Sequence, residues 1–211
     1  MAKTRVMIVD DQRLARQYFE LMVDAAEGYE VAYLVESAAF ADTYVLRDGV
    51  DLVLMDVLMN DGSSGLDAAE RIKRINPRIK VIVVTSIPEV FWMDEARAVG
   101  VDSFWYKDSS SETLAEVMDR TMAGEHVYPE AVPETRVGRA SSRDFTRREL
   151  EILRALVDGL SNEQIARRMH LSTSTVKTHL RHLLEKTGGE NRTHLAVLAR
   201  ASGLVVGSAT A

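Results

Sequence analysis

The sequence predicts an α/β domain built on a doubly wound, five-stranded parallel sheet, followed by a small all-α domain of four helices. Five short apolar runs alternate with helical patterns over the first 123 residues, whereas the last part of the chain shows helical periodicity alone. The charge divides in the same way: residues 1–123 hold 13 Lys and Arg against 22 Asp and Glu, and residues 141–211 hold 11 against 7. We therefore expect two domains with different partners, the second partner being anionic.

Strictly alternating strands and helices define the first domain. Each expected strand is a short apolar run bounded by turn formers or polar residues. The expected strands are residues 5–9, 29–35, 51–55, 81–85 and 103–106. The expected helices are residues 14–26, 38–46, 66–75, 90–99 and 111–123. This order favours a parallel sheet with right-handed crossovers.

The composition of the chain indicates the cellular compartment in which the protein works. The chain has no cysteine, which excludes disulfides and thiolate metal sites and fits a reducing cytoplasm. Its apolar runs are too short to span a bilayer, and its first residues lead into a strand without an apolar signal segment. We expect a cytoplasmic protein with no membrane partner.

Acidic and polar side chains follow several of the expected strands. Asp10 and Asp11 follow the first strand and Asp56 the third, Thr85 ends the fourth, and Lys107 follows the fifth. The carboxyl ends of parallel strands share one edge, so these side chains should meet there. Three adjacent carboxylates favour a hard cation such as Mg²⁺, with which an Asp can accept a phosphoryl group. Each residue alone has a plainer explanation, as a turn former, helix cap or solvated charge.

Residues 1–123 resemble the receiver domain of bacterial two-component response regulators. The matching motifs are Val9-Asp10-Asp11, Leu54-Met55-Asp56, Val84-Thr85-Ser86 and Tyr106-Lys107-Asp108. The resemblance implies that Asp56 is the phosphoacceptor and that a sensor histidine kinase is the donor. It also implies that Asp10, Asp11 and Asp56 hold Mg²⁺ together with the backbone carbonyl of Leu58.

The same resemblance assigns three further roles in the site. It implies that Thr85 and Lys107 contact the phosphoryl group. It places Phe104 at the aromatic switch position, whose rotation is coupled in this family to movement of the threonine.

The chain departs from the family pattern beside the phosphoacceptor. The usual proline is replaced by Asn60, and the loop of residues 61–65 is one residue longer than the common form. Leu58 and Ile87, at positions that tune dephosphorylation, are apolar and cannot orient an attacking water. We therefore expect slow self-dephosphorylation.

Residues 124–142 read as a linker between the two domains. This stretch holds Pro129 and Pro133, two glycines and little apolar periodicity, with a short ordered start expected at residues 126–128. At the other end of the chain, the weakly patterned residues 205–211 are expected to be disordered.

The basic C-terminal domain, residues 143–204, has capping signals at regular points. Thr146, Ser161 and Ser172 each precede a helical pattern. The expected helices are residues 147–157, 162–169, 173–187 and 191–201. The tight turn at His170-Leu171 joins the second helix to the third, an arrangement that lays the third in a DNA major groove.

The third helix of this domain has a polar face opposite its apolar stripe. That face carries Thr173, Ser174, Lys177, Thr178, Arg181 and His182. These side chains offer hydroxyls and cations to phosphates and base edges, although an amphipathic basic helix can also be only a solvated surface. His179 and His182 do not suggest a metal site, because no third ligand is evident.

Residues 143–204 closely resemble the LuxR-type helix-turn-helix domain. The matching stretches are Gly159-Leu160-Ser161-Asn162-Glu163-Gln164-Ile165-Ala166, Ser174-Thr175-Val176-Lys177-Thr178-His179 and Asn191-Arg192-Thr193. The resemblance implies base contacts from Lys177, Thr178 and Arg181. The residues it places nearer the DNA backbone are Thr175, His182, Arg192 and Thr193.

Together the two halves resemble a NarL/FixJ-type response regulator. The resemblance implies a phosphorylation-controlled transcription factor that binds double-stranded promoter DNA, with an inverted repeat read by a homodimer. Two other classes of protein share part of this pattern. An enzyme of the haloacid dehalogenase type would carry Asp-x-Asp after the first strand, whereas Asp10 and Asp11 are adjacent. A constitutive DNA-binding protein with a vestigial receiver stays open, and phosphorylation by acetyl phosphate distinguishes it.

Overall fold

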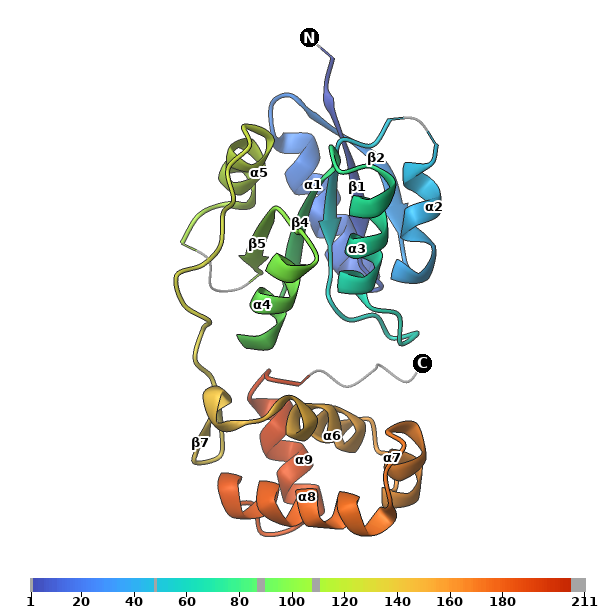
Figure 1. The fold of residues 1–211 in the computed structure, drawn as a ribbon. Coiled ribbons are helices and arrows are strands. Elements are labelled where there is room, and N and C mark those ends of the chain that lie inside the picture. The colour runs from blue at the N-terminus through green and yellow to red at the C-terminus, as the bar shows by residue number, and fades with distance from the viewer. Residues whose placement is uncertain (1, 48, 87–89, 108–110, 206–211) are drawn as a thin grey trace. The chain divides into compact units, whose positions relative to one another are not determined.

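The structure is a computed structural model that describes residues 2–47, 49–86, 90–107 and 111–205 (Figure 1). The described chain forms two compact units: residues 2–86 with residues 92–131, and residues 90–91 with residues 132–205. Each unit is considered by itself. No described helix is both long and apolar enough to pass through a bilayer.

A five-stranded parallel sheet in the order β2-β1-β3-β4-β5 organises the N-terminal unit, which confirms the predicted fold class. The strands are β1 (Thr4–Val9), β2 (Tyr29–Val35), β3 (Leu52–Met55), β4 (Lys80–Thr85) and β5 (Ser103–Tyr106). All four residues of β3 are fully buried, as expected for an apolar strand covered on both faces. The chain places β2 on one side of β1 and then crosses to place β3 on the other side. The strand order therefore reverses between β1 and β3, beside their carboxyl ends.

Helices cover both faces of this sheet. The helical elements are α1 (Arg13–Ala25), η1 (Ala38–Phe40), α2 (Ala41–Val45), α3 (Gly65–Ile75), α4 (Val90–Ala98) and α5 (Leu114–Met122). Phe19 of α1 and Leu114 of α5 share one apolar cluster with Ile8 and Leu54 of the sheet. Alternate strand residues therefore face this cluster, as the period of two requires.

Local hydrogen bonds move two helix starts away from the predicted positions. Thr113 and Glu116 form a capping box, so α5 begins at Leu114 and not at residue 111. Ser37 Oγ accepts a hydrogen bond from Ala39 N and caps a 3₁₀ turn, so the predicted helix of residues 38–46 is η1 followed by a short α2.

Both ends of the segment 124–142 pack against a unit. Near its start, Val127 N donates to Ser103 Oγ over 3.0 Å and the Val127 carbonyl accepts from Phe104 N over 2.8 Å, which confirms order at residues 126–128. Near its end, β6 (Arg136–Val137) and β7 (Ala140–Ser141) form an antiparallel hairpin whose apolar residues enter the second core. These residues fall in the predicted linker, and the sequence did not predict the hairpin.

Four helices form the rest of the C-terminal unit, as predicted (Figure 1). They are α6 (Arg147–Val157), α7 (Asn162–Arg168), α8 (Thr173–Thr187) and α9 (Arg192–Ala201), with the short 3₁₀ turn η2 (Ser142–Asp144) before them. Thr146 and Ser161 make capping boxes, and Ser172 caps α8. Gly188 ends α8 in the left-handed conformation at φ 75°.

The C-terminal core extends further along the chain than the sequence suggested. Val205 is 1% exposed and packs in the same cluster as Leu204 and Leu195. The expectation of disorder from residue 205 was therefore wrong for Val205, because its side chain completes an apolar core. Residues 206–211 lie outside the described residues.

Candidate functional site

The sheet brings three carboxylates to one edge. Val9 of β1 pairs with Met55 of β3, and Asp56 N donates to the Val9 carbonyl over 2.9 Å, so the residues after both strands lie side by side. Asp10, Asp11 and Asp56 each offer one oxygen, and these oxygens all lie within 4.8 Å of one another. Asp10 is fully buried and Asp56 is 7% exposed. The structure thus brings together the acids that the sequence grouped.

Lys107 supplies the cation of this cluster. Its Nζ lies 2.6 Å from Asp10 Oδ2 and 3.6 Å from Asp56 Oδ2. Its backbone N donates to the Thr85 carbonyl over 2.9 Å, which fixes the end of β5 against the end of β4. The stem passes the ring of Phe19, whose centroid lies 5.3 Å from Nζ. Lys107 is therefore held between the two buried acids.

The electrostatics of the cluster favour a bound cation. Burial raises the pKa of Asp56 to about 7, with Lys107 opposing the rise and Asp10 adding to it. Burial also raises the pKa of Asp11, and a hydrogen bond from Asn60 N acts against it. The raised pKa values mean that burial disfavours the charged carboxylates. A hard divalent cation would stabilise the charged forms, since carboxylate oxygens are the ligands that Mg²⁺ prefers. The three converging carboxylates fit that ion.

Two further predicted residues lie on the neighbouring strands: Thr85 ends β4, and Phe104 is the second residue of β5. Thr85 is 1% exposed and pairs with Tyr106 across the β4–β5 ladder. Phe104 is also 1% exposed, and its ring centroid lies 5.1 Å from that of Tyr106 and 6.2 Å from that of Tyr128. The aromatic side chain at the predicted switch position is thus packed inward. Ile87 lies outside the described residues.

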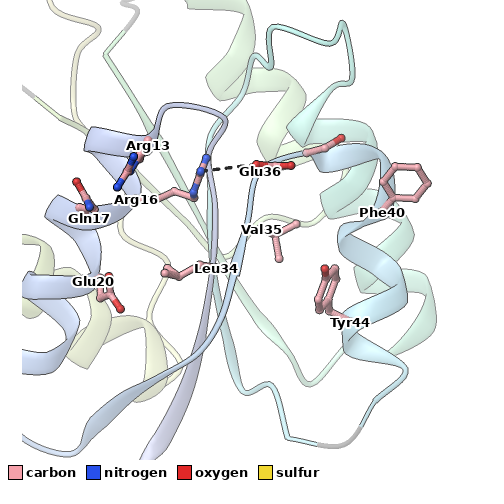
Figure 2. Close-up of a pocket in the computed structure, with 10 residues that line it drawn as sticks. Arg13, Arg16, Gln17, Glu20, Leu34, Val35, Glu36, Phe40 and Tyr44 are labelled. Atoms are coloured by element: carbon pink, nitrogen blue, oxygen red, sulfur yellow. Dashed lines mark ion pairs between the residues drawn. The ribbon is translucent and has the colours of Figure 1, made fainter.

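Arg16 reaches the acid cluster from α1, which the sequence did not indicate. Its Nη1 donates to the Asp10 carbonyl over 2.6 Å, while its Nη2 lies 3.8 Å from Glu36 Oε2 (Figure 2). Arg16 also lines a cavity of about 560 Å³ between α1, β2 and α2, with Leu34 and Tyr44 on its other walls (Figure 2). A basic residue in the first turn of α1 was the only signal available for this contact.

A second buried acid, Asp102, lies at the opposite end of the sheet. It accepts hydrogen bonds from Lys73 Nζ over 2.7 Å, Lys80 Nζ over 3.0 Å and Val81 N over 2.9 Å. Burial acts to raise the pKa of Asp102, but these donors together lower it. The carboxylate oxygens of Asp102 are hydrogen-bonded within the N-terminal unit. Asp102 therefore connects the start of β5 to β4 and is not part of the acid cluster.

In the C-terminal unit, α8 exposes most of the predicted polar face. Its apolar residues Val176, Leu180 and Leu183 are buried in the core. Six of the residues predicted to contact DNA are exposed: Ser174, Lys177, Thr178, Arg181, His182 and, at the start of α9, Thr193. Thr173 and Thr175 are half-buried. This side of the helix carries cations and hydroxyls, which suits a phosphate-rich duplex.

Arg192 is used inside the domain. Its Nη1 donates to Asn162 Oδ1 over 2.6 Å, and its Nη2 donates to the Leu160 carbonyl. The guanidinium thus holds the start of α9 against the turn before α7, a role that the sequence did not indicate. Its expected contact with the DNA backbone stays a prediction.

Two family models match the chain. The response regulator receiver domain matches residues 6–119, and the luxR family of bacterial regulatory proteins matches residues 143–199. Fold and site therefore define a receiver joined to a LuxR-type DNA-binding domain. The chain belongs to the two-component response regulator family, whose members of this architecture are transcription regulators and not metabolic enzymes.

Full-length relatives and solved structures agree with this assignment. The chain is 34% identical over 201 residues to response regulator protein VraR of Staphylococcus epidermidis, covering 92% of this chain and 95% of that protein. VraR of Staphylococcus aureus is 34% identical over 203 residues with the same coverage. The crystal structure of response regulator ChrA of a heme-sensing two-component system is 25% identical, with a TM-score of 0.52 and coverage of 97% of this chain and 100% of that chain. The structure of an RcsB–DNA complex is 19% identical, with a TM-score of 0.56 and coverage of 94% and 98%, and it supports the fold alone.

Proposed function

We propose that Asp56 accepts a phosphoryl group from the phosphohistidine of a sensor histidine kinase. The observation that carries this proposal is the convergence of Asp10, Asp11 and Asp56 within 4.8 Å, with Lys107 Nζ beside two of them. A carboxylate oxygen of Asp56 attacks the phosphorus, the phosphorus–nitrogen bond breaks, and the histidine leaves with the bonding electron pair. Mg²⁺ held by the three carboxylates and the Leu58 carbonyl would neutralise charge on the transferring oxygens.

Lys107 and Thr85 act on the product of this transfer. Lys107 Nζ lies 3.6 Å from Asp56 Oδ2, so a small movement away from Asp10 pairs it with the new acylphosphate. The Thr85 hydroxyl donates to another phosphoryl oxygen, and Phe104 adjusts its packing as Thr85 moves. A surface of the receiver then changes, and with it the dimer or interdomain contacts.

Acetyl phosphate with Mg²⁺ tests the receiver part of the proposal. Intact mass should show one added phosphoryl group on the wild-type chain and none on Asp56→Asn. The matched control Asp67→Asn removes an exposed acid of the first turn of α3 and should still be labelled. An unlabelled wild-type chain would instead identify a constitutive DNA-binding protein with a vestigial receiver.

For the C-terminal domain we propose that α8 enters the major groove of double-stranded promoter DNA. Lys177, Thr178 and Arg181 are exposed on the same helix and would contact base edges. The residues proposed nearer the sugar-phosphate backbone are Thr173, Ser174, Thr175, His182, Arg192 and Thr193. Two such domains, paired through α9 after phosphorylation, would read an inverted repeat as a homodimer.

DNA titrations of single variants test this interface. Arg181→Ala should weaken specific binding by about 1–3 kcal/mol and relax specificity at one base position. Lys177→Ala should do the same at a neighbouring position. The control Arg147→Ala removes an exposed cation of α6 that pairs in the wild type with Glu151 and not with DNA in this proposal, and it should leave specificity unchanged. Equal affinity of wild type and both α8 variants for the selected site would exclude α8 as the reading helix.

The remaining assignments complete the proposal. We propose a receiver at residues 1–123, a linker at 124–142, an output domain at 143–204 and a tail after it, in a protein of the cytoplasm. We also propose slow self-dephosphorylation, because Leu58 and Ile87 carry no group that could orient water. Loss of the phosphoryl group within minutes, followed by intact mass in the absence of kinase, would contradict this last point.

A further inference from the structure

Backbone hydrogen bonds close the loop after β3 on both sides of Leu58. Gly65 N donates to the Val57 carbonyl over 2.9 Å, and Met59 N donates to the Ser63 carbonyl over 3.4 Å. The Leu58 carbonyl takes no part in these two bonds, although they fix its position closely. Whatever holds this small hairpin therefore also sets where the Leu58 carbonyl lies.

Asp61 ties the tip of the loop to a different element. Its Oδ2 accepts a hydrogen bond from Ser37 Oγ over 2.5 Å, and its Oδ1 accepts from Ser63 N over 2.8 Å and Ser63 Oγ over 2.6 Å. Ser37 itself caps η1 through Ala39 N. The exposed tip of the loop is thus fastened to the turn that follows β2.

The residue before Asp61 reaches the acid cluster. Asn60 N donates a hydrogen bond to Asp11 Oδ2, so the loop and the cluster share one contact. A proline at position 60 would fix φ by its ring, and asparagine has no such restraint. Gly62 has φ 82°, a left-handed conformation that favours glycine, and its N donates to the Met59 carbonyl over 3.0 Å. The hydrogen bond from Ser37 to Asp61 therefore adds a tie to the turn after β2 that the backbone hydrogen bonds within the loop do not make.

We propose that Asp61, through its hydrogen bond with Ser37, is a positioning residue for the divalent cation. It fixes the loop that carries the Leu58 carbonyl and the Asn60–Asp11 contact, and Leu58 and Asp11 are residues that would hold the ion. This inference rests on the proposed Mg²⁺-dependent function and deepens it. Partners that orient metal ligands commonly change metal affinity 10- to 100-fold when they are removed.

Mg²⁺ titration of the full chain, followed by amide NMR of the receiver, tests the inference without using phosphorylation. Asp61→Ala and Ser37→Ala should each raise the Mg²⁺ dissociation constant by about ten-fold or more. Because both variants break one shared contact, the double variant should be little weaker than the weaker-binding single variant. The matched control Asp67→Ala removes an exposed acid of the adjacent helix and should stay within about two-fold of wild type.

The outcomes separate this inference from the proposed function. Dissociation constants of Asp61→Ala and Ser37→Ala equal to that of wild type would overturn the inference and leave phosphorylation of Asp56 untouched. An effect of Asp61→Ala without one of Ser37→Ala would overturn the tie between the two. A wild-type chain that neither binds Mg²⁺ nor takes a phosphoryl group would overturn the proposed function, and the inference with it. Native-like amide spectra are required of both variants, as the check that they fold.

Discussion

Replacing Asp56 by asparagine should stabilise the metal-free receiver while abolishing phosphorylation. The reason is that burial raises the pKa of Asp56 to about 7, so ionising this side chain at neutral pH costs folding free energy. Relative to an ordinary Asp pKa of about 3.9, the linkage gives an upper limit of about 4 kcal/mol at pH 8. Asparagine keeps the shape and carries no charge.

The sign of the pH dependence follows from the direction of the pKa shift. The folded state holds the Asp56 proton more tightly than the unfolded state, so stability is lost as pH rises from about 4 to 7. The advantage of Asp56→Asn should therefore be small at about pH 4 and should grow until about pH 8. Saturating Mg²⁺ should reduce it, because the cation favours the charged carboxylate of the wild type.

Urea unfolding in EDTA measures this difference domain by domain. The chain has two tryptophans, Trp92 and Trp105, and both are buried residues of the receiver unit, so their fluorescence follows the unfolding of that unit. Asp67→Asn serves as the charge-matched control, since this acid is exposed. A stability difference between Asp56→Asn and wild type that is flat from pH 4 to 8, or that favours wild type at pH 8, would refute the reasoning.

Three further predictions concern single contacts. Gly65→Ala should cost about 3 kcal/mol in the same tryptophan assay and slow phosphorylation, because an added Cβ would lie 1.8 Å from the Asp56 carbonyl oxygen. Lys186→Met should destabilise the C-terminal unit by about 3 kcal/mol in amide hydrogen exchange of α8, because Lys186 Nζ donates to Glu149 Oε2 over 2.7 Å. Burial acts to raise the pKa of Glu149, yet Lys186 and the capping contacts lower it, so this loss should appear at neutral pH and fade below about pH 4. His170→Gly should stabilise the same unit by about 0.5–1 kcal/mol, because His170 has φ 52°, and a less stable variant would count against the strain.

The acids of the receiver site could be predicted because the order of strands along the chain determines which residues lie at the carboxyl edge of the sheet. An alternation of apolar runs and helices predicts a parallel sheet, and a parallel sheet places Asp10 and Asp56 at one edge. The capping signals at Thr146, Ser161 and Ser172 predicted helix starts for a similar reason, since a cap and its helix are neighbours in sequence. Local spacing and chain order were enough for both.

Contacts between residues distant in sequence were decided only by the tertiary structure. Nothing in the order of residues indicated that Arg192 would donate to Asn162, which lies 30 positions earlier in the chain. Val205, in a stretch without periodicity, was found in the core because the preceding helices leave an apolar space there.

By itself, then, the sequence determined the two domains, their fold classes and the acids that meet at the sheet edge. Only the tertiary structure decided how the loop after β3 is held, because the tie between Ser37 and Asp61 joins two turns that follow different strands. Hydrogen bonds of that kind depend on side-chain directions and distances of a few ångströms, which periodicity and composition do not encode.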